Sequence, residues 1–251
     1  MLDLRIVLVE PAGALNVGAV ARVMKNMGLS QLWLVNPQFD FQTDRFSEAA
    51  QNMAVHAQDL LDTAHIVPDL PTALAGCQRA IATAGRIDEG ETQPLSPSAG
   101  LTWLIAVETA AIVFGREDRG LSNTELQYCQ QIMRIPVSDD YPSLNLAQAV
   151  GICCYQLRLL SQTSIDRPDP ELPLSQDLKA DVDLASIDMT EAYYENLQEI
   201  LLKIGYLYPH TTFHRMEKLR HLFNKANLSA AEVKMLRGIL RQINWAISRN
   251  T

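Results

Sequence analysis

The sequence predicts an α/β domain with a mostly parallel sheet, followed by a small all-α extension at the C-terminus. Short apolar, β-branched runs alternate with stretches of helical spacing through the first part of the chain, which is typical of βα units. An acidic stretch with three Pro residues follows, and only helical periodicity returns after it. We therefore expect an α/β domain at 1–160, a flexible acidic linker at 161–190 and a helical extension at 191–251.

The strands expected in the α/β domain are short apolar runs that end at Pro, Gly or charged residues. They lie at residues 4–9, 32–35, 80–83, 111–114 and 131–136. The expected helices lie at residues 16–27, 47–61 and 145–160, and one more begins after Ser122, which forms a capping box with Glu125. Ligands of such sheets bind beyond the carboxyl ends of the strands. Here these ends are residues 10–22, 83–90, 115–121 and 136–146.

The extension is expected to contain three short helices. Residues 191–206 and 211–226 have helical spacing, and a second capping box, from Ser229 to Glu232, begins the third helix. The apolar residues that share one face of this third helix are Val233, Leu236, Leu240, Ile243 and Ile247. A minidomain of this size has only a small core and is marginally stable alone.

The net charge of −8 combines two regions of opposite sign. Residues 1–202 carry a net charge of −15, whereas residues 203–251 carry +7 and three of the five His residues. Such a split is typical of a polyanion-binding appendage on an acidic body. A small helical region with a basic solvated face explains the composition equally well, so charge alone does not decide between the two.

Composition excludes several classes of protein. A chain that is 47% hydrophobic and 20% charged is globular rather than disordered, collagen-like or disulfide-rich. No apolar run approaches the roughly 18 residues that span a membrane, and the first residues lack the pattern of a signal peptide. The four Cys residues form no CxxC pair. We therefore expect buried reduced thiols, no structural metal, no membrane contact and a cytoplasmic location.

Three loops at the ends of predicted strands contain residues suited to ligand binding. Asn16 lies at a strand-to-helix turn, and Arg22, almost two turns further along, can reach back toward the strand ends. Glu117 lies between two Gly residues, and Ser143 and Asn145 lie where the last long helix begins. Each of these residues alone is explained by a surface salt bridge or by N-capping. Neither the GxGxxG pattern of dinucleotide-binding proteins nor a P-loop is present.

Taken together and in this order, the three loops resemble the three motifs of the SpoU/TrmH family of RNA ribose 2′-O-methyltransferases, which belongs to the SPOUT class. The matching segments are Asn16-x-Gly18-Ala19-x-x-Arg22, Phe114-Gly115-x-Glu117-x-x-Gly120-Leu121, and Ile135-Pro136 with Ser143-Leu144-Asn145-Leu146-Ala147-x-Ala149-Val150. Residues 32–37, and residues 218–223 with 236–240, further resemble the branch of this family that methylates the ribose at position 32 of tRNA.

The resemblance implies a trefoil knot in the C-terminal part of the α/β domain, S-adenosylmethionine bound there, and an obligate homodimer. In that dimer, Arg22 of one subunit would lie near the cofactor of the other. The residues implied to line the cofactor are Thr83, Ala84, Gly85, Gly115, Ile135, Pro142, Ser143 and Leu144. The catalytic set implied is Arg22, Asn16, Glu117, Ser143 and Asn145. The tRNA phosphates would be held by Arg215, Lys218, Arg220 and Lys225 of the basic tail.

The activity implied is the transfer of the sulfonium methyl group to the ribose 2′-hydroxyl of the pyrimidine at position 32 of tRNA. The family assigns activation of this hydroxyl to the motif 1 arginine, but a guanidinium stays protonated in proteins. We therefore interpret Arg22 as a cation that holds the adjacent phosphate and stabilises the developing alkoxide, while the proton leaves to phosphate or water. Two alternatives stay open. One is 2′-O-methylation of another tRNA position or of ribosomal RNA, and the other is a non-catalytic RNA-binding protein.

Overall fold

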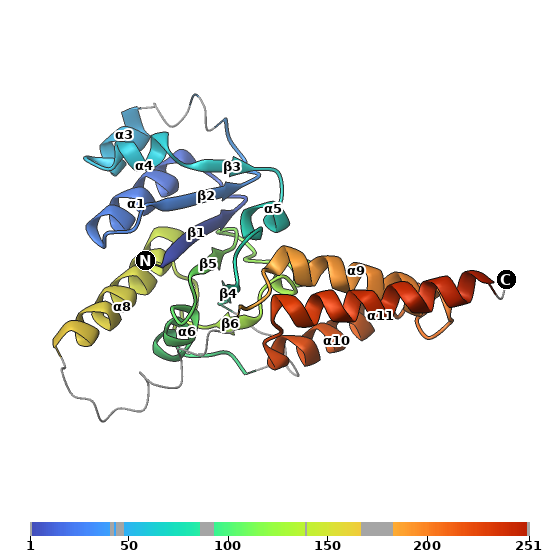
Figure 1. Cartoon of the computed structure of the whole chain (residues 1–251). Coiled ribbons are helices and arrows are strands. Elements are labelled where there is room, and N and C mark those ends of the chain that lie inside the picture. Colours follow the sequence, from blue (N-terminus) through green and yellow to red (C-terminus); the bar gives the residue numbers. More distant parts are fainter. Residues whose placement is uncertain are drawn as a thin grey trace.

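The computed structural model describes residues 2–40, 43, 48–85, 93–138, 140–166 and 183–249. It contains a sheet with helices on both faces, from which an elongated bundle of helices projects (Figure 1). The predicted fold class, an α/β domain with a parallel sheet and an all-α extension, is confirmed. The trefoil knot stays a prediction.

The sheet has six strands in the order β3-β2-β1-β5-β4-β6, and each pairing between them is parallel. The strands are β1 (Asp3–Val9), β2 (Gln31–Val35), β3 (His65–Val67), β4 (Arg79–Thr83), β5 (Thr109–Phe114) and β6 (Gln131–Met133). In β1, Ile6 and Leu8 pack into the core on one face of the sheet, and Val7 and Val9 pack into the core on the other. Burial on both faces explains why this strand has a continuous apolar sequence.

Helices cover the two faces of the sheet unequally. They are α1 (Ala14–Asn26), α3 (Glu48–Ala54), α4 (Gln58–Asp62), α5 (Leu70–Leu74), α6 (Pro97–Leu104), α7 (Asn123–Leu126) and α8 (Leu146–Asp166). Five of them, α1, α3, α4, α6 and α8, pack on one face around residues such as Val20, Met24 and Leu104. The other face is covered by α5, by Leu126 of α7 and by Ile187 from the start of the extension. The second face therefore takes part of its core from the extension.

The extension consists of α9 (Ile187–Lys203), α10 (Thr212–Ala226) and α11 (Ala230–Arg249). Its core includes Tyr193 and Tyr194 of α9 and Val233 and Leu240 of α11. The predicted capping box at the start of α11 is present. The N–H and the hydroxyl of Ser229 each donate to the carboxylate of Glu232 at 2.8 Å, and the Glu232 N–H donates back to the Ser229 hydroxyl at 3.3 Å. Of the five residues predicted to share the apolar face of α11, Ile243 is exposed.

Two hydrogen bonds join the start of the extension to the sheet domain. The N–H of Ile187 donates to the carbonyl of Cys77 at 2.8 Å, and the N–H of Gly76 donates to the carboxylate of Asp188 at 2.8 Å. Gly76 and Cys77 lie between α5 and β4. The first turn of α9 is therefore held against the segment that leads into a strand of the sheet.

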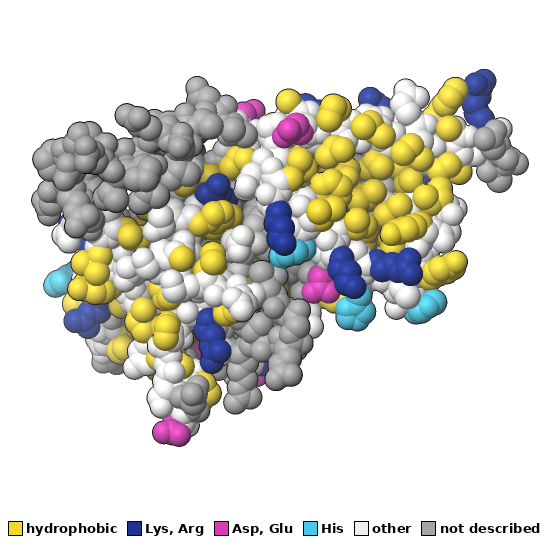
Figure 2. Space-filling model, turned by 90° about the horizontal axis from the view of Figure 1, so that it is seen from below, with side chains coloured by type: hydrophobic (Ala, Val, Ile, Leu, Met, Phe, Trp, Pro, Cys, Tyr) yellow, Lys and Arg dark blue, Asp and Glu magenta, His cyan; other side chains and the backbone are white. Residues whose placement is uncertain are grey.

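The extension leaves a broad apolar surface uncovered, which Figure 2 shows as a patch of hydrophobic side chains with Lys, Arg and His beside it. Large exposed side chains on α10 and α11 include Leu222, Met235, Ile239 and Trp245. A bundle of three helices has a high ratio of surface to volume, so part of its apolar surface stays in contact with solvent.

The chain departs from the predicted elements where they are short. The sequence pattern does not predict β3, α5 or α6, because three to eight residues are too few to show a periodicity. The helix predicted at 47–61 is divided into α3 and α4, since Val55 between them has a left-handed backbone (φ 53°). Strand β6 ends three residues before the predicted end at Pro136, which has no N–H for a sheet ladder.

The helix predicted at 145–160 continues further than expected. Helix α8 ends at Asp166, six residues into the predicted linker, and α9 begins at Ile187, inside its other end. Residues 167–182 of the predicted linker lie outside the described residues. The boundaries of the three predicted parts therefore stay predictions, whereas the helices at both ends of the linker are longer than expected.

All four Cys residues are buried free thiols, as predicted. Burial raises the pKa of Cys77 to about 11 and that of Cys153 and Cys154 to about 12. In the described part of the chain, no helix is long and apolar enough to cross a membrane. The same residues contain no group of three side chains that could hold a metal ion.

Candidate active site at the carboxyl edge of the sheet

A pocket of about 440 Å³ opens at the carboxyl ends of β4, β5 and β6. It is lined by residues that follow each of these strands and by residues around the start of α8. All eight residues predicted to line the cofactor line this pocket: Thr83, Ala84, Gly85, Gly115, Ile135, Pro142, Ser143 and Leu144. This edge is where parallel α/β sheets bind their ligands.

The loop after β5 folds back on itself at Gly115. A Cβ placed on Gly115 would lie 2.3 Å from the carbonyl carbon of Gly120 and 2.4 Å from the nitrogen of Leu121, so no side chain fits there. Arg116 and Gly120 exchange two backbone hydrogen bonds, of 3.2 and 3.0 Å, and Gly120 has the left-handed backbone (φ 69°) that this tight turn needs. The result is a closed loop whose backbone forms one wall of the pocket.

Arg116 anchors this loop through two carboxylates. Its Nε donates to Glu10 at 2.5 Å, and its two terminal nitrogens donate to both oxygens of Glu125 at 2.8 and 2.9 Å. The hydrogen bond from Arg116 is the main cause of a lowered pKa for Glu10. Burial opposes ionisation of Glu125, but hydrogen bonds from Arg116 and Ser122 outweigh it and lower the pKa of this carboxyl as well. The pairs fix the guanidinium in one orientation.

Three predicted catalytic residues form a chain of hydrogen bonds that joins the three motif loops. The carboxylate of Glu117 accepts from the N–H of Ala12 at 3.2 Å and from Nδ2 of Asn16 at 2.8 Å. Asn145 donates from its Nδ2 to Oδ1 of Asn16 at 3.3 Å, and its own Oδ1 accepts from the N–H of Ala147 at 2.9 Å, which caps α8. Because Nδ2 of Asn16 donates to Glu117, the Oδ1 end of the Asn16 amide is the one that faces Asn145.

Four of the five predicted catalytic residues lie in the pocket or are hydrogen-bonded to a residue that lines it, and the fifth, Arg22, does not. Glu117 and Ser143 line the pocket, and Asn16 and Asn145 connect to it through the hydrogen bonds of Glu117. Arg22 is exposed on α1 and does not line the pocket of its own subunit. It lies six residues beyond Asn16, about 9 Å along the helix. If Arg22 takes part in the reaction, the pocket of one chain alone is therefore not a complete site.

One predicted RNA-binding residue has a structural position instead. Arg220 forms an ion pair with Glu191, and its guanidinium lies 4.6 Å from the ring centre of Tyr194 and 5.9 Å from that of Tyr128. Tyr128 belongs to the sheet domain, so Arg220 contributes to the junction between the extension and that domain. The phosphate-binding role of Arg220 stays a prediction, although the guanidinium is half-buried and already paired with Glu191.

The other three predicted RNA-binding residues are exposed. Arg215 donates to the carbonyl of Tyr206 at 2.8 Å and lies over the ring of the same residue. Lys218 and Lys225 make no ion pair with any residue that the structure describes. Arg215 likewise makes no ion pair with a described residue, so the charges of all three can meet an anion.

Sequence reasoning did not single out Arg116 or Glu10, although both hold the pocket together. Arg116 occupies a position that the second motif leaves unspecified, and Glu10 is the first residue after β1, with a left-handed backbone (φ 46°). Glu125 was expected only as part of a capping box, which is present. A charged residue directly beside Gly115 in the loop was the available signal, but its partners lie 106 and 9 residues away.

Two protein families match the chain, one for each part of the structure. The SpoU rRNA Methylase family matches residues 3–155, and the C-terminal domain of the tRNA methyltransferase TrmJ matches residues 188–251. The first match spans more than half of the chain. This chain belongs to the SpoU methylase family. Residues 3–155 include the three loops that the hydrogen bonds of Glu117, Asn16 and Asn145 join.

Relatives of similar length contain both parts. The tRNA (cytidine/uridine/adenosine-2′-O-)-methyltransferase TrmJ of Pseudomonas aeruginosa (strain UCBPP-PA14) is 37% identical over 247 residues, which are 96% of this chain and 94% of that protein. The tRNA (cytidine/uridine-2′-O-)-methyltransferase TrmJ of Escherichia coli (strain K12) is 36% identical over 250 residues, 96% and 95% of the two chains.

Solved structures support the same grouping. The crystal structure of TrmJ from Z. mobilis ZM4 is similar with a TM-score of 0.79 at 29% identity, over 96% of this chain and 98% of that one. A structure described as giving insight into the 2-OH methylation of C/U34 on tRNA is similar with a TM-score of 0.50 at 25% identity. It covers 64% of this chain and 92% of its own.

The carboxylates around Arg116 are expected to make stability sensitive to acid. The pKa values of Glu10 and Glu125 are below the usual 4.5, so ionisation stabilises the fold above this pH and the effect is lost as the pH falls through the lowered values. Glu125→Gln should lower the free energy of unfolding by about 2 kcal/mol at neutral pH. It should also lose less stability than the wild type between neutral pH and acid pH. Urea unfolding at both pH values measures this.

Glu108→Gln is the control, because Glu108 is an exposed carboxylate just before β5. It should behave as the wild type at both pH values. Equal acid sensitivity of the wild type and Glu125→Gln would show that the Arg116 pairs do not stabilise the fold.

Gly115→Ala is expected to disrupt the pocket. The added methyl group would overlap the backbone of Gly120, so the loop must shift, and overpacking of this kind costs roughly 1–3 kcal/mol. The Kd for S-adenosylmethionine, the cofactor that the family resemblance implies, should rise at least about tenfold. Isothermal titration measures it. Gly13→Ala is the matched control, since a Cβ there meets nothing within 4 Å. Unchanged affinity of Gly115→Ala would contradict the role of this close approach.

Proposed function

We propose that this protein transfers a methyl group from S-adenosylmethionine to the ribose 2′-hydroxyl of tRNA, at the pyrimidine of position 32. The observation that carries this proposal is that the TrmJ relatives align with the sheet domain and the extension together, over 94–95% of their own length. The pocket at the residues expected for the cofactor supports the reaction, and the basic extension supports an RNA substrate.

The pocket has the chemistry that S-adenosylmethionine requires. Leu121, Ile135 and Leu144 supply apolar surface for an adenine ring. Of the charged groups that line the pocket, Arg116, Arg119 and Asp118 are in ion pairs, whereas the carboxylate of Glu117 forms none with a described residue and favours a cationic ligand. Gly115 allows the loop that walls the pocket to close on itself, because a Cβ there would overlap the backbone of Gly120 and Leu121. When bound, the cofactor supplies a methyl group on a sulfonium, which leaves as a neutral thioether.

The residues of this chain then have the task of aligning and activating the ribose. The bond from carbon to sulfur breaks as the bond from carbon to the 2′-oxygen forms, and the hydroxyl proton leaves to phosphate or water. Asn16, Glu117 and Asn145 hold one another rigidly at the pocket, so the ribose meets polar groups that need no rearrangement. Arg22 holds the adjacent phosphate and stabilises the developing negative charge on the oxygen.

A homodimer would bring Arg22 to the reaction. In the chain that the structure describes, Arg22 makes no ion pair and lies on the exposed side of α1. Helix α8 packs beside α1 and exposes Ile152 and Tyr155, and Leu15 is exposed at the start of α1. We propose that two subunits pair through this apolar surface, which places Arg22 of each at the pocket of the other.

The test is methyl transfer from labelled S-adenosylmethionine to unmodified tRNA transcripts, with the product mapped by nucleoside analysis. A 2′-O-methylated pyrimidine at position 32 is the expected result. Methylation at position 34, the nucleotide named for one structural relative, would keep the reaction and correct the position. Transfer to ribosomal RNA alone would correct the substrate, and cofactor binding without any transfer would favour an RNA-binding protein.

Arg22→Lys in the same assay tests the role of the guanidinium. Lys keeps the charge but loses the planar fork that holds phosphate and alkoxide together. The loss of an oriented donor to a developing oxyanion typically costs about 10²–10³ in kcat, and a fall of this size is expected. Turnover close to that of the wild type would contradict the proposed role.

Mixing two inactive variants tests whether Arg22 acts across the dimer. Arg22→Ala lacks the cation, and Gly85→Leu fills the pocket, which Gly85 lines with room for a Cβ at 3.8 Å from its nearest neighbour. After dissociation and reassociation in equal amounts, half of the dimers are mixed and each has one complete site, so about a quarter of wild-type activity should return. If Arg22 acts within its own subunit, no activity returns.

A further inference from the structure

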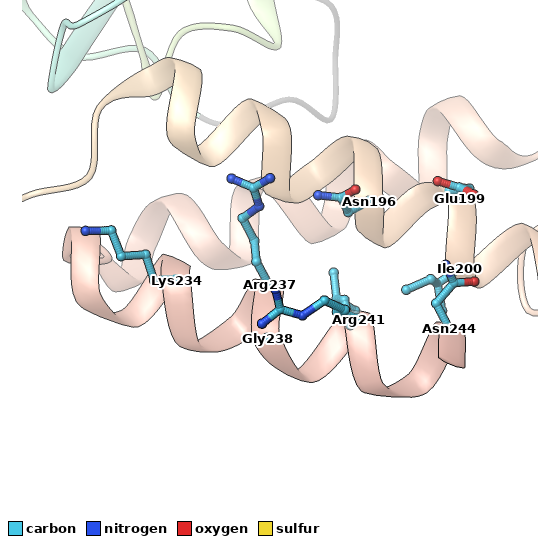
Figure 3. Close-up of a pocket in the computed structure, with 9 residues that line it drawn as sticks. Asn196, Glu199, Ile200, Lys234, Arg237, Gly238, Arg241 and Asn244 are labelled. Atoms are coloured by element: carbon cyan, nitrogen blue, oxygen red, sulfur yellow. The ribbon is translucent and has the colours of Figure 1, made fainter. Parts of the chain in front are cut away.

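A second cavity, of about 550 Å³, lies in the extension between α9 and α11 (Figure 3). It shares no lining residue with the pocket of the sheet domain. We call it the α9–α11 groove. Three cations of α11, Lys234, Arg237 and Arg241, line one side of it. They are spaced by three and four residues, so they share one face of the helix over about 10 Å.

The charge of these three cations is not compensated by the described residues. None of them forms an ion pair there, and all three are exposed. Arg237 and Arg241 are four residues apart, where like charges destabilise a helix. In Figure 3, Arg237 extends toward α9, and Arg241 lies along α11 beside Gly238. A bound anion between them would remove the repulsion.

The one carboxylate that lines the groove is already neutralised. Glu199 accepts from Nζ of Lys203 at 2.5 Å, and the same Lys203 donates to Oδ1 of Asn244 at 3.1 Å. This network closes one end of the groove and leaves the remainder positive. A cationic or neutral ligand would therefore gain nothing from the charges of the groove.

Gly238 forms the floor between the cations. It lies in the interior of α11, where Gly costs helix stability, and a Cβ placed on it would meet nothing within 4 Å. Packing therefore does not require a glycine at this position. Its effect is to leave the helix backbone open between Arg237 and Arg241, so that a bulky anion can approach closely.

We propose that the α9–α11 groove binds the sugar–phosphate backbone of the RNA substrate, with Lys234, Arg237 and Arg241 as the phosphate ligands. The inference rests on the proposed function and names the surface of the extension that holds the substrate. It replaces Arg220, whose charge Glu191 already neutralises. Contacts of this kind position the RNA without reading its sequence.

The test compares tRNA binding by three forms of the full chain across a salt series. Wild-type affinity for tRNA falls as the salt concentration rises. In the triple variant Lys234→Gln, Arg237→Gln, Arg241→Gln, the fold-change in affinity between 50 and 200 mM salt should be about 20- to 40-fold smaller than in the wild type, as expected for three lost phosphate contacts. Arg237→Lys with Arg241→Lys keeps the charge and should keep the salt dependence. In methyl transfer, the triple variant should raise KM for tRNA at least about tenfold and leave kcat unchanged.

A pair of substitutions at Gly238 tests the floor of the groove. Gly238→Ala adds only an uncharged methyl group, which meets no atom of the chain within 4 Å, so it should weaken tRNA binding much less than Gly238→Glu does. Gly238→Glu places a carboxylate between the arginines and should weaken binding at least about tenfold at low salt. Both variants should unfold cooperatively, since neither side chain meets a neighbour at its Cβ.

The proposal fails if the triple variant keeps the affinity and the salt dependence of the wild type, or if both Gly238 variants bind tRNA equally. It also fails if salt dependence is lost only in the variant Lys218→Gln with Lys225→Gln on α10. The proposed function fails separately, when the wild type methylates no RNA. The binding measurement does not depend on methyl transfer, so the two failures are distinguishable.

Discussion

The close approach of Gly115 to Gly120 is the constraint on which the pocket depends. Because the two backbones lie almost in contact, the loop after β5 has one closed conformation. That conformation directs Arg116 toward Glu10 and Glu125, and the next residue, Glu117, toward Asn16. One steric condition thus orients two charged side chains that hold loops from three different parts of the chain.

Opposite charge in the two parts of the chain has a structural counterpart. In the acidic sheet domain, the half-buried Arg116 pairs with two carboxylates. In the extension, the half-buried ion pair of Arg220 with Glu191 lies at the junction, and other cations are exposed. A charge count along the sequence cannot separate these roles, since Arg220 and Lys218 are two residues apart on the same helix. Their difference arises from which face of α10 meets Tyr194 and Tyr128.

Much of the fold follows from the sequence because it depends on local patterns. β1 and β5 are continuous apolar runs, and the capping boxes at Ser122 and Ser229 are present as the spacing predicts. The elements that were missed, β3, α5 and α6, are too short for a pattern. The order of the strands, with β4 between β5 and β6, depends on pairings between distant segments that no local pattern contains.

The candidate site follows from the sequence to a similar extent. The family resemblance implied the eight residues expected to line the cofactor, and all eight line one cavity. The Glu10 to Arg116 contact joins residues 106 apart, and the α9–α11 groove needs two helices placed side by side. Such arrangements arise only on folding. The exposed position of Arg22 likewise could not be read from its helical spacing.

The attachment of α9 to the sheet domain also fixes the distance between the α9–α11 groove and the pocket. The start of this helix is fixed just before β4, because Ile187 donates to Cys77 and Asp188 accepts from Gly76. At the far end of β4, Thr83 lines the pocket. Rigid elements thus connect the groove to the pocket. An RNA held along the groove would present to the pocket the nucleotide that lies one fixed span away. The extension would then act as a ruler, and the shape of the RNA would select the methylated residue.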